Sequence, residues 1–427
     1  MRTPKTLLLC FPLLALSLTS CSTADSASQS ESATDATGNP SAASSSAPAQ
    51  IGDGHGTLEG STEVAEPQLH LMSVDTDGRI DLLNLADETT TSVGDVPQVS
   101  ATSTDGRYLF ASSATTGTMT IVDSGMWTWD HEDHFHYYSG EPKTIGTIKG
   151  EGEAIVTAGS SATGVYFPDS GKATVLDNDA LAKGEIRVRA DLSTDPHPGV
   201  LVPLSDVTLL TEPDSAGTAA SVQAYDKDGQ AIDGATADCA DAQGSITTSV
   251  GTVIGCDDGA LLATLEADEV VYERIPYPAE MSSPKATEFR AREGRPTVAA
   301  VAGNQGAWLL DTRERSWQFI PTDVPLLQVS AVDDREGHVV ALADNGRVLV
   351  LIAETGATIA ATEPLLPQTL ANPALLAGVE LTTDQQRAYL NAPAERTLFE
   401  IDFADNARIA RTFDTDTVPA HMVEVGR

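Results

Sequence analysis

Short runs of apolar and β-branched residues, each ended by a turn rich in Gly, Asp or Asn, recur from about residue 66 to the end of the chain. In segment 69–83 two such runs flank the turn Asp77-Gly78, and segment 338–351 repeats the pattern around Asp344-Asn345-Gly346. Apolar runs joined by short turns of this composition are typical of β-hairpins. Helical periodicity is nearly absent from this region, so the pattern predicts an all-β fold.

The hairpins group into units of four strands that begin near residues 98, 152, 197, 243, 287, 325 and 377. The spacing of about 40 to 55 residues matches one blade of a β-propeller. A further unit is split between the two ends, with its middle strands in 69–85 and its innermost strand in 421–425. We therefore expect a propeller of eight blades, closed by N- and C-terminal strands. Seven blades is the alternative, because the unit at 287–321 is weakly phased, and a pair of β-sandwiches is the other architecture that fits.

The N-terminus carries the features of an export signal. Arg2 and Lys5 precede an apolar run over residues 7–18, which ends in the lipobox Leu18-Thr19-Ser20-Cys21. The run is shorter than the roughly 20 residues that span a bilayer. We therefore expect residues 1–20 to be a lipoprotein signal peptide and Cys21 to carry the lipid, on the extracytoplasmic face of the cell membrane. A cleaved secretory signal followed by an incidental cysteine is the alternative.

Residues 21–65 consist mainly of Ser, Ala, Thr, Gly and acidic residues. Such a segment buries too little apolar surface to offset its ordering entropy, so we expect a disordered tether ahead of a propeller domain at 66–427. The net charge of −37 argues against a nucleic acid partner. We expect a monomer that touches the membrane only through its lipid.

Two cysteines remain in the expected propeller, Cys239 and Cys256. Both fall in one sheet region of a chain that we expect in an oxidising compartment, which predicts a disulfide between them. A redox role or thiolate binding of a metal is the alternative.

Three of the eight histidines lie in segment 131–138, where they alternate with acidic and aromatic residues. Neutral imidazoles and carboxylates are the usual ligands of Zn²⁺. If the segment is extended, His134 and His136 project to one side, while His131 and Asp133 project to the other. The segment therefore predicts a zinc site at His134 and His136, with Glu132 preceding them on that face. His131 and Asp133 are candidates either for positioning these ligands or for a second site. A solvated acidic loop that holds histidines by chance is the alternative.

Two more histidines occupy equivalent positions in the blade scheme. His197 and His421 each stand where an innermost strand starts, and innermost strands line the central channel of a propeller. Both are therefore candidate zinc ligands at one mouth of the channel. His70 and His338 fall in or at the start of second-strand runs and are expected to be packed.

The chain resembles the AztD family of extracytoplasmic zinc metallochaperones over nearly the whole expected propeller. The resemblance rests on segments 122–127 and 133–138, 197–204, 255–262 with upstream Cys239, and His421-Met422. It implies a β-propeller that binds Zn²⁺ and passes it, without catalysis, to the solute-binding protein of a zinc ABC importer. A metal-dependent propeller hydrolase or lactonase, and a scaffold propeller that binds protein or glycan, are the alternative functions.

Overall fold

The computed structural model describes residues 56–130, 134–279, 281 and 283–427. The expected signal peptide, the lipid site at Cys21 and most of the expected tether lie outside the described residues, as do the candidate ligands His131 and Asp133. These assignments stay predictions. Among the described residues, no helix has the length and apolar character needed to cross a bilayer.

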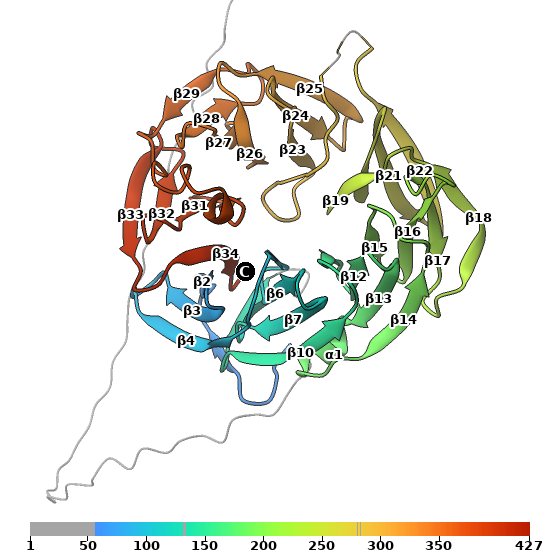
Figure 1. Ribbon diagram of the computed structural model, residues 1–427, viewed down its shortest axis with the longest axis horizontal. Coiled ribbons are helices and arrows are strands. Elements are labelled where there is room, and N and C mark those ends of the chain that lie inside the picture. Colours follow the sequence, from blue (N-terminus) through green and yellow to red (C-terminus); the bar gives the residue numbers. More distant parts are fainter. Residues whose placement is uncertain (1–55, 131–133, 280, 282) are drawn as a thin grey trace, which may run out of the picture. The chain divides into compact units, whose positions relative to one another are not determined.

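Eight antiparallel sheets stand side by side around a common centre, which confirms the β-propeller class (Figure 1). The first four, each given from its innermost strand outward, are β34–β2–β3–β4 (Pro419–Val425, His70–Asp75, Arg79–Asn84, Thr90–Asp95), β5–β6–β7–β10 (Ala101–Thr104, Tyr108–Ser113, Thr118–Asp123, Lys143–Lys149), β11–β12–β13–β14 (Ile155–Ala158, Ala162–Phe167, Lys172–Asp177, Val188–Ser193) and β15–β16–β17–β18 (Leu201–Leu204, Val207–Pro213, Ala219–Tyr225, Ala231–Asp238).

The ring continues with four further sheets, and two short helices occur in the described residues. The sheets are β19–β20–β21–β22 (Gln243–Thr247, Thr252–Cys256, Gly259–Glu266, Glu269–Pro276), β23–β24–β25 (Thr297–Val301, Gly306–Asp311, Ser316–Pro321), β26–β27–β28–β29 (Leu326–Ala331, His338–Ala343, Val348–Ile352, Thr358–Ala361) and β30–β31–β32–β33 (Leu381–Thr383, Ala388–Ala392, Thr397–Asp402, Arg408–Asp414). The helices are α1 (Asn178–Ala182) and α2 (Pro373–Leu376).

The apolar core lies between neighbouring sheets rather than at the centre of the ring. Each of the eight pairs of adjacent sheets shares one cluster of buried aliphatic and aromatic side chains, including the pair formed by the last sheet and the first. The apolar runs supply these clusters because alternate residues of a strand face opposite sheets. Each of the eight sheets of the ring therefore packs both of its faces against a neighbouring sheet.

The C-terminal strand closes the ring, as the sequence predicts. Strand β34 pairs with β2 in antiparallel register, with Leu71 opposite Glu424 and Val74 opposite His421. The innermost strand of the first sheet thus comes from the far end of the chain, which fastens the two ends together.

The sheet β23–β24–β25 explains why the four-strand repeat of the sequence is irregular near residue 287. It has three strands, and an irregular segment takes the inner position that a strand fills in the other sheets. Arg290 forms an isolated antiparallel bridge to Ala299 in β23, and Ala291 forms a parallel bridge to Ala331 in β26.

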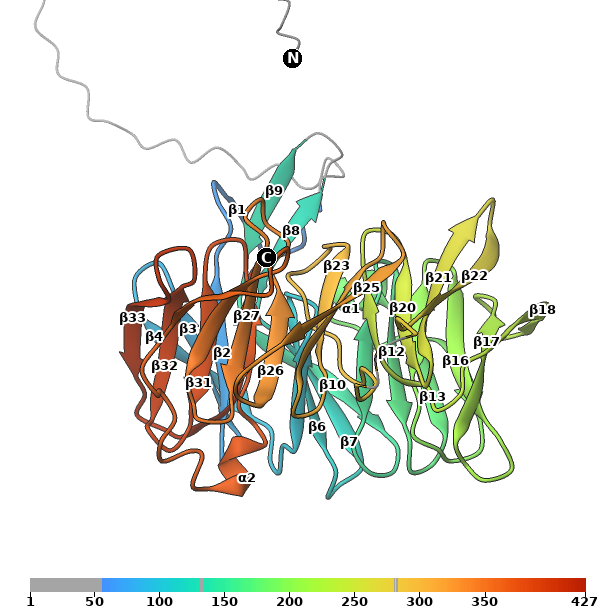
Figure 2. The same ribbon diagram turned by 90° about the horizontal axis from the view of Figure 1, so that it is seen from above.

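A separate three-stranded sheet rises from one face of the ring (Figure 2). It contains β1 (Thr62–Val64), β8 (Met126–Asp130) and β9 (Phe135–Ser139), in the order β1–β9–β8. The hairpin of β8 and β9 is inserted between β7 and β10 of the second sheet. Strand β1 falls within residues 21–65, the segment expected to be a disordered tether. Its backbone nevertheless pairs with β9. The folded part of the chain therefore begins before the expected boundary.

The structure joins Cys239 and Cys256 by a disulfide, with Cα atoms 5.1 Å apart. Cys239 follows the outer strand β18 of one sheet, and Cys256 ends β20 of the next. Both side chains belong to the buried cluster between these two sheets, so the bond links neighbouring blades.

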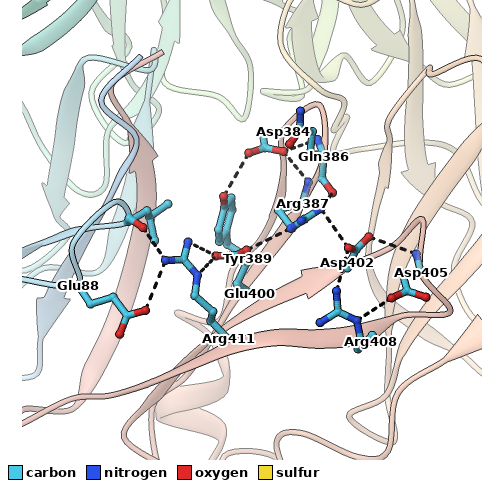
Figure 3. A network of polar contacts seen from close by, with 11 residues as sticks. Glu88, Asp384, Gln386, Arg387, Tyr389, Glu400, Asp402, Asp405, Arg408 and Arg411 are labelled. Carbon is cyan, nitrogen blue, oxygen red and sulfur yellow. Dashed lines mark hydrogen bonds and ion pairs between the residues drawn. The ribbon is translucent and has the colours of Figure 1, made fainter. Parts of the chain in front are cut away.

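A chain of ion pairs lies on the last sheet and reaches the first (Figure 3). Glu400 on β32 is 5% exposed, and its side chain accepts hydrogen bonds from Arg387, which directly precedes β31, and from Arg411 on β33. Arg411 also donates to the carbonyl of Leu85 and lies 3.6 Å from Glu88, both in the turn that follows β3. These contacts join the closing pair of blades on the same sheet face as the apolar cluster that the two blades share.

Candidate metal centre

The hairpin of β8 and β9 brings His134 and His136 together. His136 lies on β9 and His134 immediately precedes that strand, so alternation places both rings on one side. The ring centroids are 4.6 Å apart. The two histidines therefore have the mutual position that the sequence predicts for a pair of ligands.

Strand β1 adds a carboxylate to this pair. The Nδ1 atom of His136 lies 2.7 Å from Oε1 of Glu63, whose side chain is 57% exposed. Sequence reasoning missed Glu63, because it lies in the expected tether and more than 70 positions before the histidines. Only the pairing of β1 with β9 places it there. Two imidazoles and a carboxylate match the donor chemistry of a zinc site.

Buried aromatic and charged groups fix the base of the hairpin. Trp127 stacks on Tyr138 across the hairpin, with centroids 5.2 Å apart. The Arg107 guanidinium lies 4.2 Å from the centre of the Trp127 ring and forms two hydrogen bonds, of 3.0 and 2.7 Å, to Asp123. The Trp127 indole N–H also donates to the carbonyl of Gly56. These contacts hold the histidine-bearing sheet to the second blade.

His197 occupies a different place, in the joint between the third and fourth sheets. Its side chain is buried, and its Nδ1 atom lies 3.0 Å from the Tyr166 hydroxyl and 2.8 Å from the carbonyl of Asp195. Its Nε2 atom lies 2.9 Å from the hydroxyl of Thr211. Gly199 permits this packing, since a Cβ there would lie 2.1 Å from the Thr211 hydroxyl. A zinc ion at His197 would have to displace contacts that join two blades, so this arrangement favours a structural role.

His421 lies at the start of the innermost strand β34, as expected, and its side chain is largely buried. Burial lowers the pKa of His421, although a hydrogen bond to the carbonyl of Val99 and the charge of Glu153 act in the opposite direction. Val99 and Glu153 lie in the loops that precede β5 of the second sheet and β11 of the third. A lowered pKa favours the neutral imidazole that a metal requires, and the role of His421 as a ligand stays a prediction.

A further group that could hold a metal ion occurs in the turn between β26 and β27. Ligand atoms of Asp334, Glu336 and His338 all lie within 4.8 Å of one another. His338 is buried, as the sequence predicts, but one ring nitrogen contacts Asp334. The alternating spacing of the three residues is the only signal in the sequence that could have identified this group.

Comparison with known proteins agrees with this fold. The chain matches no family profile. It is 24% identical over 273 residues to the zinc chaperone AztD of Citrobacter koseri, an alignment that covers 61% of this chain and 64% of that protein. The chain is thus aligned with a little under two thirds of that relative's length.

Solved structures show the same architecture over a larger part of the chain. The crystal structure of Citrobacter koseri AztD superposes with a TM-score of 0.73 and 19% identity, and covers 85% of this chain and 99% of that one. The apo form of the same protein gives a TM-score of 0.74 at 17% identity, with 84% and 98% covered. The dihydro-heme d1 dehydrogenase NirN also matches, with a TM-score of 0.54 and 15% identity over 85% of this chain and 76% of that one. This chain is thus similar in sequence to the zinc chaperone AztD of Citrobacter koseri and shares its fold.

Proposed function

We propose that this protein is an extracytoplasmic zinc metallochaperone that holds Zn²⁺ on the β8–β9 hairpin and delivers it to the solute-binding protein of a zinc ABC importer. One observation carries the proposal: His134 and His136 lie side by side, with the Glu63 carboxylate against one of them. The similarity to a protein named as a zinc chaperone supports the same conclusion.

The proposed chemistry is ligand exchange. Neutral imidazoles and a carboxylate hold the ion, and ligands of the partner displace them one at a time. His131 and Asp133 lie within three positions of His134 and are proposed as further ligands. Zinc competes with protons for imidazole nitrogen, so affinity falls in mildly acidic solution. The proposal involves no catalysis.

The position of the hairpin suits transfer to another protein. The sheet of β1, β8 and β9 stands out from the ring (Figure 2). Trp129 and Phe135 are 43% and 55% exposed, and they flank His136 along the hairpin. Exposed aromatic side chains of this kind are common at protein–protein contacts. We propose that the receiving protein docks here and thereby reaches the zinc ligands directly.

We also propose that a lipid on Cys21 keeps the protein at the outer face of the cytoplasmic membrane. A flexible tether would then raise the local concentration of the zinc donor near a membrane-bound importer. Release of the protein into the medium after Cys21→Ala would support this arrangement, whereas unchanged membrane association would contradict it.

Zinc titration of the purified protein, followed by native mass spectrometry, tests the function. We expect the double variant His134→Ala/His136→Ala to lose one bound zinc ion and Glu63→Gln to bind that ion at least about tenfold more weakly. Glu66→Gln, which removes the same charge from an exposed position nearby, should bind as the wild type does. Unchanged zinc binding in the double variant would refute the proposal, and zinc-dependent hydrolysis of esters or lactones that is lost in the double variant would favour an enzyme instead.

A further inference from the structure

The turn between β26 and β27 concentrates groups that bind transition metals. Asp334 and Glu336 lie in the turn, and His338 is the first residue of β27. Ligand atoms of all three residues lie within 4.8 Å of one another. A histidine nitrogen with two carboxylates is a donor set found in zinc sites, and this one is formed by a single short segment of a different blade from the β8–β9 hairpin.

Among the described residues, neither carboxylate forms an ion pair with Lys or Arg, although Arg292 lies close enough to interact with the charge of Asp334. Asp334 accepts a hydrogen bond of 2.9 Å from the backbone N–H of His338, and its other oxygen lies 2.5 Å from Nδ1 of the same residue. In the described part of the chain, no Lys or Arg nitrogen lies within 4.0 Å of an oxygen of Asp334 or Glu336. The adjacent Asp333 differs, because it accepts from Arg295 and Thr297. The turn thus keeps two carboxylates that no Lys or Arg of the described residues holds in an ion pair.

A cavity borders His338, although neither Asp334 nor Glu336 belongs to its lining. Its volume is 320 Å³, and its lining includes His338, Gly337 and Asp333 together with Asp311 and Glu354. The imidazole of His338 is buried among strands on its other side and packs against the ring of Phe403 at 5.5 Å. Its position is therefore fixed by the core, whereas Glu336 is exposed and can move toward an incoming ion.

We propose that Asp334, Glu336 and His338 form a second zinc site, independent of the proposed site on the β8–β9 hairpin. Zinc–ligand bonds of about 2.0–2.2 Å in tetrahedral geometry place ligand atoms about 3.3–3.6 Å apart. The Asp334–His338 contact must therefore open by about 1 Å and Glu336 must close in. When Zn²⁺ binds Nδ1 of His338, a proton on that nitrogen moves to Nε2 if the imidazole is neutral and leaves to solvent if it is an imidazolium.

The donor set also fixes the class of ion. One imidazole with two carboxylates favours Zn²⁺, Co²⁺ or Ni²⁺ over Ca²⁺ and Mg²⁺, which take oxygen ligands in larger number or in octahedral geometry. With three protein ligands, a water completes the coordination sphere. The ion therefore remains exchangeable, and its affinity is lower than that of a closed four-ligand site.

Isothermal titration with Zn²⁺ and Co²⁺ tests this site in three single variants. We expect Glu336→Gln and Asp334→Asn to weaken one binding event at least about tenfold, which corresponds to about 1.4 kcal/mol. The matched control Glu354→Gln removes the same charge from an exposed residue that lines the cavity beside His338, and it should bind both ions as the wild type does. Glu336 is exposed, so its substitution should leave the melting temperature unchanged even if Asp334→Asn lowers it.

The same titration in a His134→Ala/His136→Ala background separates this site from the hairpin. If adding Glu336→Gln to this background removes a further zinc-binding event, the second site is supported, whether or not the hairpin binds zinc. Equal affinities in Glu336→Gln, Glu354→Gln and the wild type would overturn it. So would a zinc-soaked crystal without an anomalous scattering peak at the turn.

Discussion

Replacement of Glu424 by glutamine should make the folded protein more stable at pH 8. Glu424 lies on the innermost strand β34, and its side chain is fully buried at the edge of a 720 Å³ cavity in the centre of the ring. In the described part of the chain, neither carboxylate oxygen has a hydrogen-bond partner. The nearest cationic group is Arg427, whose Nη1 lies 3.7 Å away. A buried carboxylate with so little compensation is costly to ionise.

The magnitude follows from the pKa of this group. Burial raises the pKa of Glu424 from 4.5 to about 7, against the opposing charge of Arg427 and with help from Asp384 and Glu293. The folded protein therefore keeps a proton that the unfolded chain releases. The corresponding stability is fully present below pH 4.5 and is lost as the pH rises through about 7. The complete loss corresponds to about 3 kcal/mol.

Glutamine has nearly the same shape and cannot ionise, so Glu424→Gln avoids this loss. Urea unfolding should give a variant that is about 3 kcal/mol more stable than the wild type at pH 8 and within about 1 kcal/mol of it at pH 5. In thermal unfolding the difference at pH 8 corresponds to about 4 °C for a domain of this size. Asp105, whose pKa burial raises to about 6, titrates in both proteins and cancels from the comparison.

The buried Glu400 provides the matched contrast. Arg387 and Arg411 hold its carboxylate (Figure 3), so Glu400→Gln should destabilise the protein at pH 8 by about 3 kcal/mol, because two partly buried guanidinium groups lose their partner. The reasoning about Glu424 would be refuted if Glu424→Gln were less stable than the wild type at pH 8. A difference between them that is equal at pH 5 and pH 8 would refute it as well.

Three further changes test other parts of the structure. Replacing Cys239 and Cys256 by serine should lower the free energy of unfolding in urea by about 3 kcal/mol, because the bond closes a loop between residues 17 positions apart; equal unfolding midpoints would contradict this. Trp127→Ala should weaken zinc binding about tenfold in a titration and leave the melting temperature of the ring nearly unchanged, since it loosens only the hairpin base. Burial lowers the pKa of His421, so the wild type loses folding free energy as the pH falls below 6.5. His421→Gln should therefore lose less stability than the wild type between pH 7 and pH 5. Identical curves of unfolding free energy against pH for the two proteins would contradict this.

The sequence by itself determined the propeller, its closure and the direction of the paired histidines. The recurring apolar runs fix where strands begin and end, and their spacing fixes the blade length. The last run has no partner nearby in sequence, so it must pair with the first. Alternation along a strand places His134 and His136 on one side wherever the hairpin stands. The strands and the direction of the histidines follow from local geometry, and the closure follows from the count of strands in each repeat.

Only the tertiary structure decided which distant groups meet. Glu63 reaches His136 because β1 pairs with the edge strand of the inserted hairpin, and no pattern of residues in the sequence predicts that pairing. His197 contacts Tyr166 and Thr211 because two blades meet there. Likewise, the burial that raises the pKa of Glu424 arises from closure of the whole ring. Contacts and desolvation of this kind depend on how separate elements pack, and alternation within one strand carries no information about them.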